Sequence, residues 1–231
     1  MRLPRSDHSG RLLVVAFDPG VTSGWSWHCA SKEGLLTLGA VTSLRDMRKD
    51  VPIIEMSHFG REMDLGYEIG QIEAGAGEFA EDSVVDQMMF LIRKAVVAYS
   101  FDGTIDSLAV VTEDFILRND SRDRSLLAPV RLNAKLEREL RGAGLAMFLQ
   151  SPSDAKNVVT DARLKHWNVY EAGMQHGRDA QRHGILFLRR WAGQAGLRTA
   201  TEGQVRRFLG MRSRNAQNGF KDPRTATVRS V

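Results

Sequence analysis

The chain has 231 residues, 42% of them hydrophobic, with a formal net charge of +4 and a single cysteine, Cys29. This length can supply one sizeable core, the lone cysteine excludes an internal disulfide framework, and no apolar run approaches the roughly 20 residues that span a bilayer. Residues 1–11 lack the apolar segment of a signal peptide, so we expect a soluble, cytoplasmic, globular protein.

The positive charge is concentrated at the end of the chain. Residues 198–231 hold eight basic and two acidic residues, a net charge of +6, which leaves −2 for residues 1–197. We therefore predict one domain over residues 1–197 and a basic tail over residues 198–231, with disorder expected after Gly210. Such a tail favours a polyanionic partner, although a merely solubilising tail would have the same composition.

A buried strand near the N-terminus ends on a carboxylate. Leu12–Phe17 is continuously apolar and short, which predicts a central strand, and Asp18 follows directly, before the turn at Pro19-Gly20. Gly24–Cys29 predicts a second strand and Gly34–Thr42 a third, together a three-strand antiparallel meander. Asp18 either caps the turn or belongs to a site in which cations or donors meet its charge.

A second apolar strand, Leu108–Phe115, also ends on acids. Glu113 and Asp114 are adjacent, so they point to opposite faces of this strand. A helix is predicted between the two strands, and a strand–helix–strand unit makes the strands parallel, with ligands gathering at their carboxyl ends. We therefore expect Asp18 and one of the two acids at the same edge of the sheet.

The pattern elsewhere is mostly helical. Residues 83–99 and Leu126–Gly142 have apolar residues at helical spacing, and Gly144 is expected to end the second helix in the left-handed conformation. Residues 45–82 show no clean period and are treated as an insertion of uncertain structure. The second helix is expected to bury Val130, Leu132, Leu136 and Leu140.

A short strand, Leu145–Leu149, follows this helix. Asp154 is then expected to cap a short helix that carries Lys156. Lys165 lies on a further helix, which is predicted to run through Tyr170.

The last informative segment is the helical pattern Gly173–Trp191. His176, Asp179 and His183 lie at i, i+3 and i+7, on one face of this helix. Imidazole and carboxylate groups one turn apart can bind a divalent cation. The alternative is a structural role, in which His176 caps the helix, Asp179 pairs with Arg182 or Arg178 and His183 packs in the core.

The candidate site therefore consists of Asp18, Glu113 (or Asp114), His176 and Asp179. Carboxylates with a histidine suit hard cations such as Mg²⁺ or Mn²⁺. Two such ions can hold the attacking and leaving oxygens of a phosphoryl displacement. A basic tail that binds phosphates is consistent with a nucleic-acid substrate.

The order of these elements resembles the ribonuclease H-like fold, an α/β fold whose mixed sheet combines a three-strand antiparallel meander with parallel strands and is flanked by helices. Within it, FDPGVTSGW, VVTEDF and HGRDAQRH resemble the active-site segments of RuvC-like Holliday-junction resolvases, particularly those encoded by bacteriophages. The resemblance covers about residues 12–191 in the order of elements, and about thirty residues in recognisable motifs.

The resemblance implies that Asp18 is the metal ligand on the first strand, Glu113 that on the fourth strand and Asp179 that on the last helix. His176 stands where other members of the family carry a second aspartate, and would bind a metal or orient water. The implied activity is hydrolysis of DNA phosphodiesters with Mg²⁺ or Mn²⁺, two ions in all, by a homodimer on a four-way junction. The implied location is the cytoplasm of a bacterium or of a phage-infected host.

Lys156 and Lys165 resemble the basic residues of the family that contact DNA near the scissile bond. Arg118, which precedes an exposed loop expected at Asp120–Asp123, is a third candidate for DNA binding.

Three other functions stay open at this point. A nuclease of the same fold could cut flaps or RNA–DNA hybrids. An actin- or sugar-kinase-like nucleotide-binding protein is suggested by Asp18-x-Gly20-x-Thr22, which matches the phosphate loop of that superfamily. The third is a catalytically inactive DNA-binding protein of the same fold.

Overall fold

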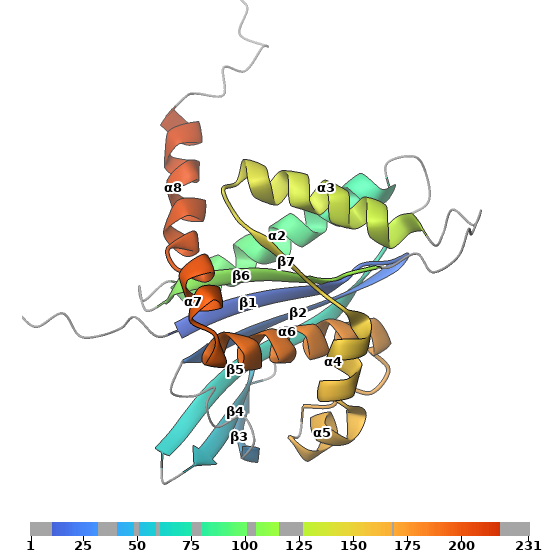
Figure 1. Ribbon diagram of the computed structural model, residues 1–231, viewed down its shortest axis with the longest axis vertical. Helices are drawn as coiled ribbons and strands as arrows, with labels where there is room; N and C mark the ends of the chain where they lie inside the picture. The colour runs from blue at the N-terminus through green and yellow to red at the C-terminus, as the bar shows by residue number, and fades with distance from the viewer. Residues whose placement is uncertain are drawn as a thin grey trace, which may run out of the picture.

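Strand β1 (Arg11–Asp18) is the central strand of the fold, and helices cover both faces of its sheet (Figure 1). The computed structural model describes residues 11–31, 41–48, 51–58, 61–74, 80–100, 105–115, 127–167 and 169–217. Residues 12–18 are all buried, which agrees with the apolar run that predicted this strand.

The sheet is mixed. β1 pairs antiparallel with β2 (Thr22–Ser31) and parallel with β6 (Ile105–Glu113), which pairs parallel with β7 (Met147–Gln150). On the other side, β2 pairs antiparallel with β5 (Arg61–Glu73). The five strands in the order β5-β2-β1-β6-β7 confirm the predicted ribonuclease H-like fold.

The third strand of the meander is not the one we predicted. The strand beside β2 is β5, which lies inside the segment 45–82 that was treated as an insertion. Most of Gly34–Thr42 lies outside the described residues, and its last two residues begin β3 (Val41–Arg48). β3 and β4 (Val51–His58) extend the sheet beyond β5 as antiparallel strands, so this segment is part of the sheet.

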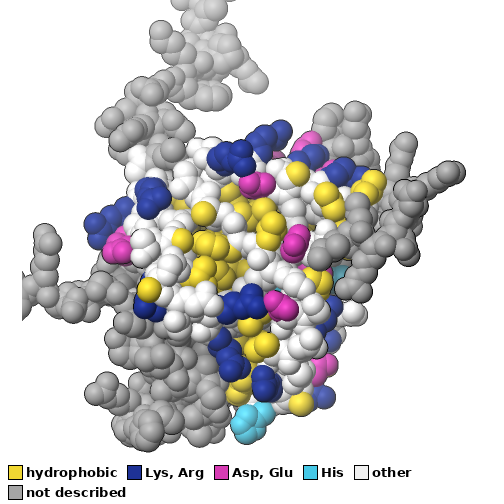
Figure 2. Space-filling model, in the orientation of Figure 1, with side chains coloured by type: hydrophobic (Ala, Val, Ile, Leu, Met, Phe, Trp, Pro, Cys, Tyr) yellow, Lys and Arg dark blue, Asp and Glu magenta, His cyan; other side chains and the backbone are white. Residues whose placement is uncertain are grey.

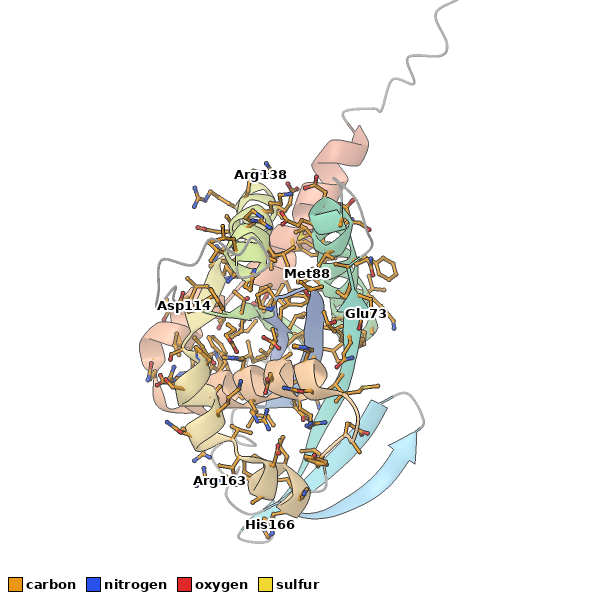
Figure 3. The ribbon with its side chains drawn as sticks, turned by 90° about the vertical axis from the view of Figure 1, so that its right-hand side faces the viewer. Glu73, Met88, Asp114, Arg138, Arg163 and His166 are labelled. Atoms are coloured by element: carbon orange, nitrogen blue, oxygen red, sulfur yellow. The ribbon has the colours of Figure 1, made fainter. Side chains whose placement is uncertain are left out.

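Two layers of helices enclose the sheet (Figures 1 and 3). One face is covered by α2 (Ala80–Ser100), α3 (Ala128–Gly142) and α8 (Gln204–Gln217). The other face is covered by α6 (Gln175–Gly193), with the short helices α4 (Pro152–Val158) and α5 (Asp161–His166) beside it. None of the helices in the described part of the chain is long and apolar enough to cross a membrane.

The period of two along the strands decides which side chains meet α6. In β1, residues Leu12, Val14 and Ala16 belong to the core under α6, and Leu13, Val15 and Phe17 to the opposite core. In β6, Ala109 and Val111 lie in the core under α6, as Phe148 of β7 does. By the same alternation, Asp18, Glu113 and Gln150 all belong to the α6 face.

Three predictions about the helices have different outcomes. Gly144 has a φ of 68° and confirms the left-handed end after α3. Val130 was expected to be buried but is 37% exposed. The buried residues of α3 are instead Ala128, Leu132, Leu136 and Leu140. Asp154 does not cap α4; Ser151 is the N-cap, and the Asp154 carboxylate pairs with Arg190 at 2.8 Å.

The segment from residue 198 is not a tail throughout. α7 (Ala195–Thr201) and α8 occupy residues up to 217, and Val205 and Phe208 of α8 are buried in the core with α2 and α3. Arg206 and Arg207 are exposed next to these buried residues, so over residues 204–210 the helix has one face for the core and another for its arginines. Residues 218–231 lie outside the described part of the chain.

Helix α6 lies so close to the sheet that glycines are required where they meet. A Cβ atom on Gly24 would collide with the carbonyl oxygen of His176, and one on Gly184 would overlap the ring of His28. A Cβ on Gly177 would lie 3.0 Å from the carbonyl oxygen of Gly70. Because the obstacle at Gly24 is backbone, it can be relieved only if α6 moves.

We therefore expect Gly24→Ala to lower the free energy of unfolding by about 2 kcal/mol through overpacking, measured by denaturant titration. Gly142→Ala is the matched control, since nothing lies within 4 Å of a Cβ at that helical position. It should leave stability unchanged or raise it slightly. Equal stabilities for the two variants would show that the contact of β2 with α6 is not tight.

Candidate active site

Asp18 and His176 meet at the end of β1. Asp18 is 8% exposed, and its Oδ2 lies 2.8 Å from Nδ1 of His176, in the first turn of α6. The turn after β1 is closed by Ser23, whose Oγ accepts from the N–H of Gly20 at 3.1 Å and donates to its carbonyl at 3.0 Å. The carboxylate thus faces α6, while Ser23 makes the hydrogen bonds that close the turn.

Glu113, and not Asp114, is the acid of β6 that faces the same helix. Oε2 of Glu113 lies 3.0 Å from Nε2 of His183, one helical turn beyond Asp179. The Asp114 N–H donates to the carbonyl of Gln150 at 2.8 Å, which joins the ends of β6 and β7. The alternation along β6 explains the choice, because Glu113 shares its parity with Ala109 and Val111.

Asp179 has basic partners on both of its oxygens. Oδ1 accepts from Nη1 of Arg182, and Oδ2 lies 3.3 Å from Nζ of Lys156 on α4. Arg182 is itself buried, and also donates to Asp161 and to the carbonyl of Val159. The arginine pair predicted as the structural alternative for Asp179 is therefore present.

The three acids act on one another electrostatically. The pKa of Asp18 is raised from 3.8 to about 6, mainly by burial and also by the charges of Glu113 and Asp179. The hydrogen bond and charge of His176 oppose this shift. The structure thus brings the four residues of the predicted site together from β1, β6 and the first two turns of α6.

Their donor chemistry fits a hard divalent cation. Carboxylate oxygens with one imidazole are ligands that Mg²⁺ and Mn²⁺ accept, and a cation would offset the burial and the repulsion that raise the pKa of Asp18. Within the described ranges, however, no group of three or more His, Cys, Asp or Glu side chains is already arranged around a common point for a metal. Each acid instead has a basic or imidazole partner of its own.

The residues expected to bind DNA lie in different places. Lys156 is half-exposed beside Asp179, and Lys165 is exposed on α5 with Nζ 4.8 Å from the ring centroid of Tyr170. Figure 2 shows basic side chains over the α4 and α5 end of this face, and Figure 3 shows Arg163 and His166 at the end of the molecule away from α3. Arg118 and the loop Asp120–Asp123 lie outside the described residues.

Sequence reasoning missed Gln150, the polar residue opposite Glu113. It did name Arg182, which follows Asp179 by three residues, a spacing that permits an ion pair on a helix. Gln150 ends β7, and the parallel register pairs it with Glu113. The signal for Gln150 was its place at the end of the next parallel strand, but this strand was predicted to end one residue earlier, at Leu149.

No protein-family model matches the chain, and no curated protein matches it. Solved structures that align along most of its length include two of RuvC. RuvC of Thermus thermophilus in complex with a Holliday junction substrate has 12% sequence identity, and the alignment covers 83% of this chain and 98% of that chain with a TM-score of 0.43. A second Thermus thermophilus RuvC structure has 13% identity over the same shares, with a TM-score of 0.38.

The raised pKa of Asp18 predicts a pH-dependent effect of Asp18→Asn in EDTA. The protonated carboxyl is favoured in the folded state, so its stabilising contribution is present below pH 3.8 and is lost as the pH rises through about 6. Above that pH, Asp18→Asn should be the more stable protein, by on the order of 2 kcal/mol, in unfolding titrations from pH 4 to pH 8. A difference that does not change with pH would contradict this electrostatic cost.

Proposed function

We propose that the protein is a divalent-metal-dependent endonuclease that hydrolyses phosphodiester bonds in branched DNA, with the four-way junction as its main substrate. The observation that carries the proposal is the meeting of Asp18, Glu113 and Asp179, from three separate elements, with His176 bonded to Asp18. Carboxylates that lie close together away from water destabilise the folded protein, because their ionised forms repel one another and lose hydration. A bound cation would offset this cost.

Asp18, Glu113 and Asp179, with His176, are the residues that would hold Mg²⁺ or Mn²⁺. When bound, such ions polarise a phosphodiester and lower the pKa of water so that hydroxide is available near neutral pH. For Asp179 to take part, its carboxylate would have to exchange Arg182 or Lys156 for the metal. Lys156 is the more readily displaced of the two, since its side chain is 52% exposed.

Two polar side chains beside the acids, His176 and Lys156, suit further steps of phosphodiester hydrolysis. The side chain of His176 is 41% exposed and is bonded to Asp18 through Nδ1. Its Nε2 can therefore orient a water molecule or accept a proton from it. Lys156 stands at the rim of the acid cluster, where an ammonium group can bind the phosphate next to the scissile one.

The choice of substrate rests on the motif resemblance. The segment FDPGVTSGW runs from the end of β1 through the turn into β2 and supplies Asp18. VVTEDF covers the end of β6 and the two residues after it and supplies Glu113, and HGRDAQRH lies in α6 and supplies His176 and Asp179. RuvC-like resolvases, bacteriophage types among them, act as homodimers, and a two-fold dimer would match the two-fold symmetry of a four-way junction. We propose the same assembly here.

The test compares two adjacent acids. Labelled four-way junction, flap, RNA–DNA hybrid and linear duplex are incubated with wild type, Glu113→Gln and Asp114→Asn, each with Mg²⁺, with Mn²⁺ or with EDTA. We expect paired symmetric nicks in the junction, absent with EDTA and at least about 100-fold slower in Glu113→Gln. Asp114→Asn is the matched control and should cut like the wild type.

Other results would redirect the proposal. Cleavage of flaps or hybrids alone would keep the site and change the substrate. Binding of the junction without cleavage of any substrate would indicate an inactive DNA-binding protein, and ATP binding would favour the nucleotide-binding alternative.

A further inference from the structure

Helix α6 contributes a second histidine to the site, and this one cannot reach the solvent. His183 is 1% exposed, with Nε2 3.0 Å from Oε2 of Glu113 and Nδ1 3.3 Å from Oε1 of Gln150. It therefore differs from His176, which is partly exposed and can touch a substrate. The proposed function gives no direct task to His183.

The chemistry of Glu113, His183 and Gln150 fixes the direction of the hydrogen bond between His183 and Glu113. An ionised carboxylate only accepts hydrogen bonds, so Nε2 of His183 carries the hydrogen and donates to Glu113. In the neutral ring Nδ1 is then an acceptor, which calls for a donor. The amide of Gln150 supplies one if its nitrogen faces the ring, and this nitrogen has no hydrogen-bond partner in the described structure as it stands.

The backbone around Glu113 is held independently of His183. The carbonyl of Glu113 accepts from Nδ2 of Asn133 on α3 at 2.8 Å, and Thr112 Oγ1 donates to Oδ1 of the same asparagine at 2.7 Å. Gln150 is tied to the next residue of β6 through the hydrogen bond from the Asp114 N–H. These bonds leave the Glu113 side chain able to rotate, and in the part of the chain that the structure describes His183 contacts its carboxylate.

We propose that His183 is a positioning residue that holds the Glu113 carboxylate by Oε2, leaving Oε1 to bind a divalent ion, and that Gln150 fixes the orientation of the imidazole. The inference rests on the proposed function, because it assigns a task toward the metal. Partners that orient metal ligands in this way typically change metal affinity by about 10- to 100-fold when they are removed.

Two polar substitutions at His183 separate positioning from simple packing. In His183→Gln the side-chain amide reaches the place of Nε2 and can still donate to Glu113. In His183→Asn the shorter amide reaches only the place of Nδ1, so it can meet Gln150 but not Glu113. Both variants keep a buried polar amide at this position, so differences in their metal binding report on the contact with Glu113.

The experiment measures Mn²⁺ binding by isothermal titration calorimetry for the wild type and both variants, each first checked by thermal unfolding. We expect His183→Gln to stay within about threefold of the wild-type dissociation constant, and His183→Asn to bind about 10- to 100-fold more weakly. His28→Gln is the matched control, because His28 is also fully buried against α6, beside Gly184, but is bonded to Ser26. It should change the melting temperature and leave Mn²⁺ affinity unaltered.

Three results would overturn the inference, and they differ from one another. Wild-type affinity in both variants, with lower melting temperatures, would make His183 a core residue only and leave the proposed nuclease intact. Equal weakening in both would show that the imidazole itself is needed. A wild type that binds no Mn²⁺ would overturn the proposed function, and the inference with it.

A second readout does not need a metal or a stable Asn variant. The Nε2–H proton of a histidine bonded to a carboxylate is detectable by ¹H–¹⁵N NMR, and we expect the His183 signal to shift in Glu113→Gln. An unchanged signal would overturn the proposed contact.

Discussion

The close approach of α6 to the sheet is the constraint on which the site depends. His176 can reach Asp18 only because Gly24 leaves room for the backbone of the first turn of α6, and Gly184 gives the same room to the His28 ring further along. Without these glycines the helix would stand away from β1 and β2, and the distances of about 3 Å that join its histidines to the strand acids could not form. The close packing of the helix on the sheet therefore places the histidines of α6 against the acids of β1 and β6.

Much of this arrangement could be predicted from the sequence, because it follows from local periodicity. An apolar run that ends on Asp18, a second that ends on Glu113-Asp114 and a helix with His176 and Asp179 one turn apart each have a short-range signal. The choice of Glu113 over Asp114 needs more than the sequence of the strand. Leu108 and Val110 belong to one core and Ala109 and Val111 to the other, and because these four residues are all apolar, the sequence does not show which set faces α6.

The parts that were not predictable depend on contacts between distant segments. The third strand of the meander could be Gly34–Thr42 by pattern alone, but β5 pairs with β2, and nothing in either segment identifies its partner. In α8, basic residues suggested a tail, whereas Val205 and Phe208 fit the core formed by α2 and α3. The composition of a segment does not distinguish the two faces of a helix, so the basic composition of this segment gave no sign of its apolar face.

The charges of the site show why its stability and its proposed task conflict. Asp18 is buried, and its pKa rises to about 6 because neither burial nor its acidic neighbours favour the ionised form. His176 partly offsets this shift. Arg182 and Lys156 each contact one oxygen of Asp179, and His183 contacts one oxygen of Glu113. A core optimised only for stability would replace these acids by apolar residues, as buried ion pairs seldom contribute net stability. The chain instead keeps three acids within range of one another and balances them with partners of unequal exposure. That inequality suits the partners to separate tasks. Arg182 and His183 are buried and hold acids in place, whereas Lys156 and His176 are partly exposed, so an ion or a phosphate could reach them from the solvent.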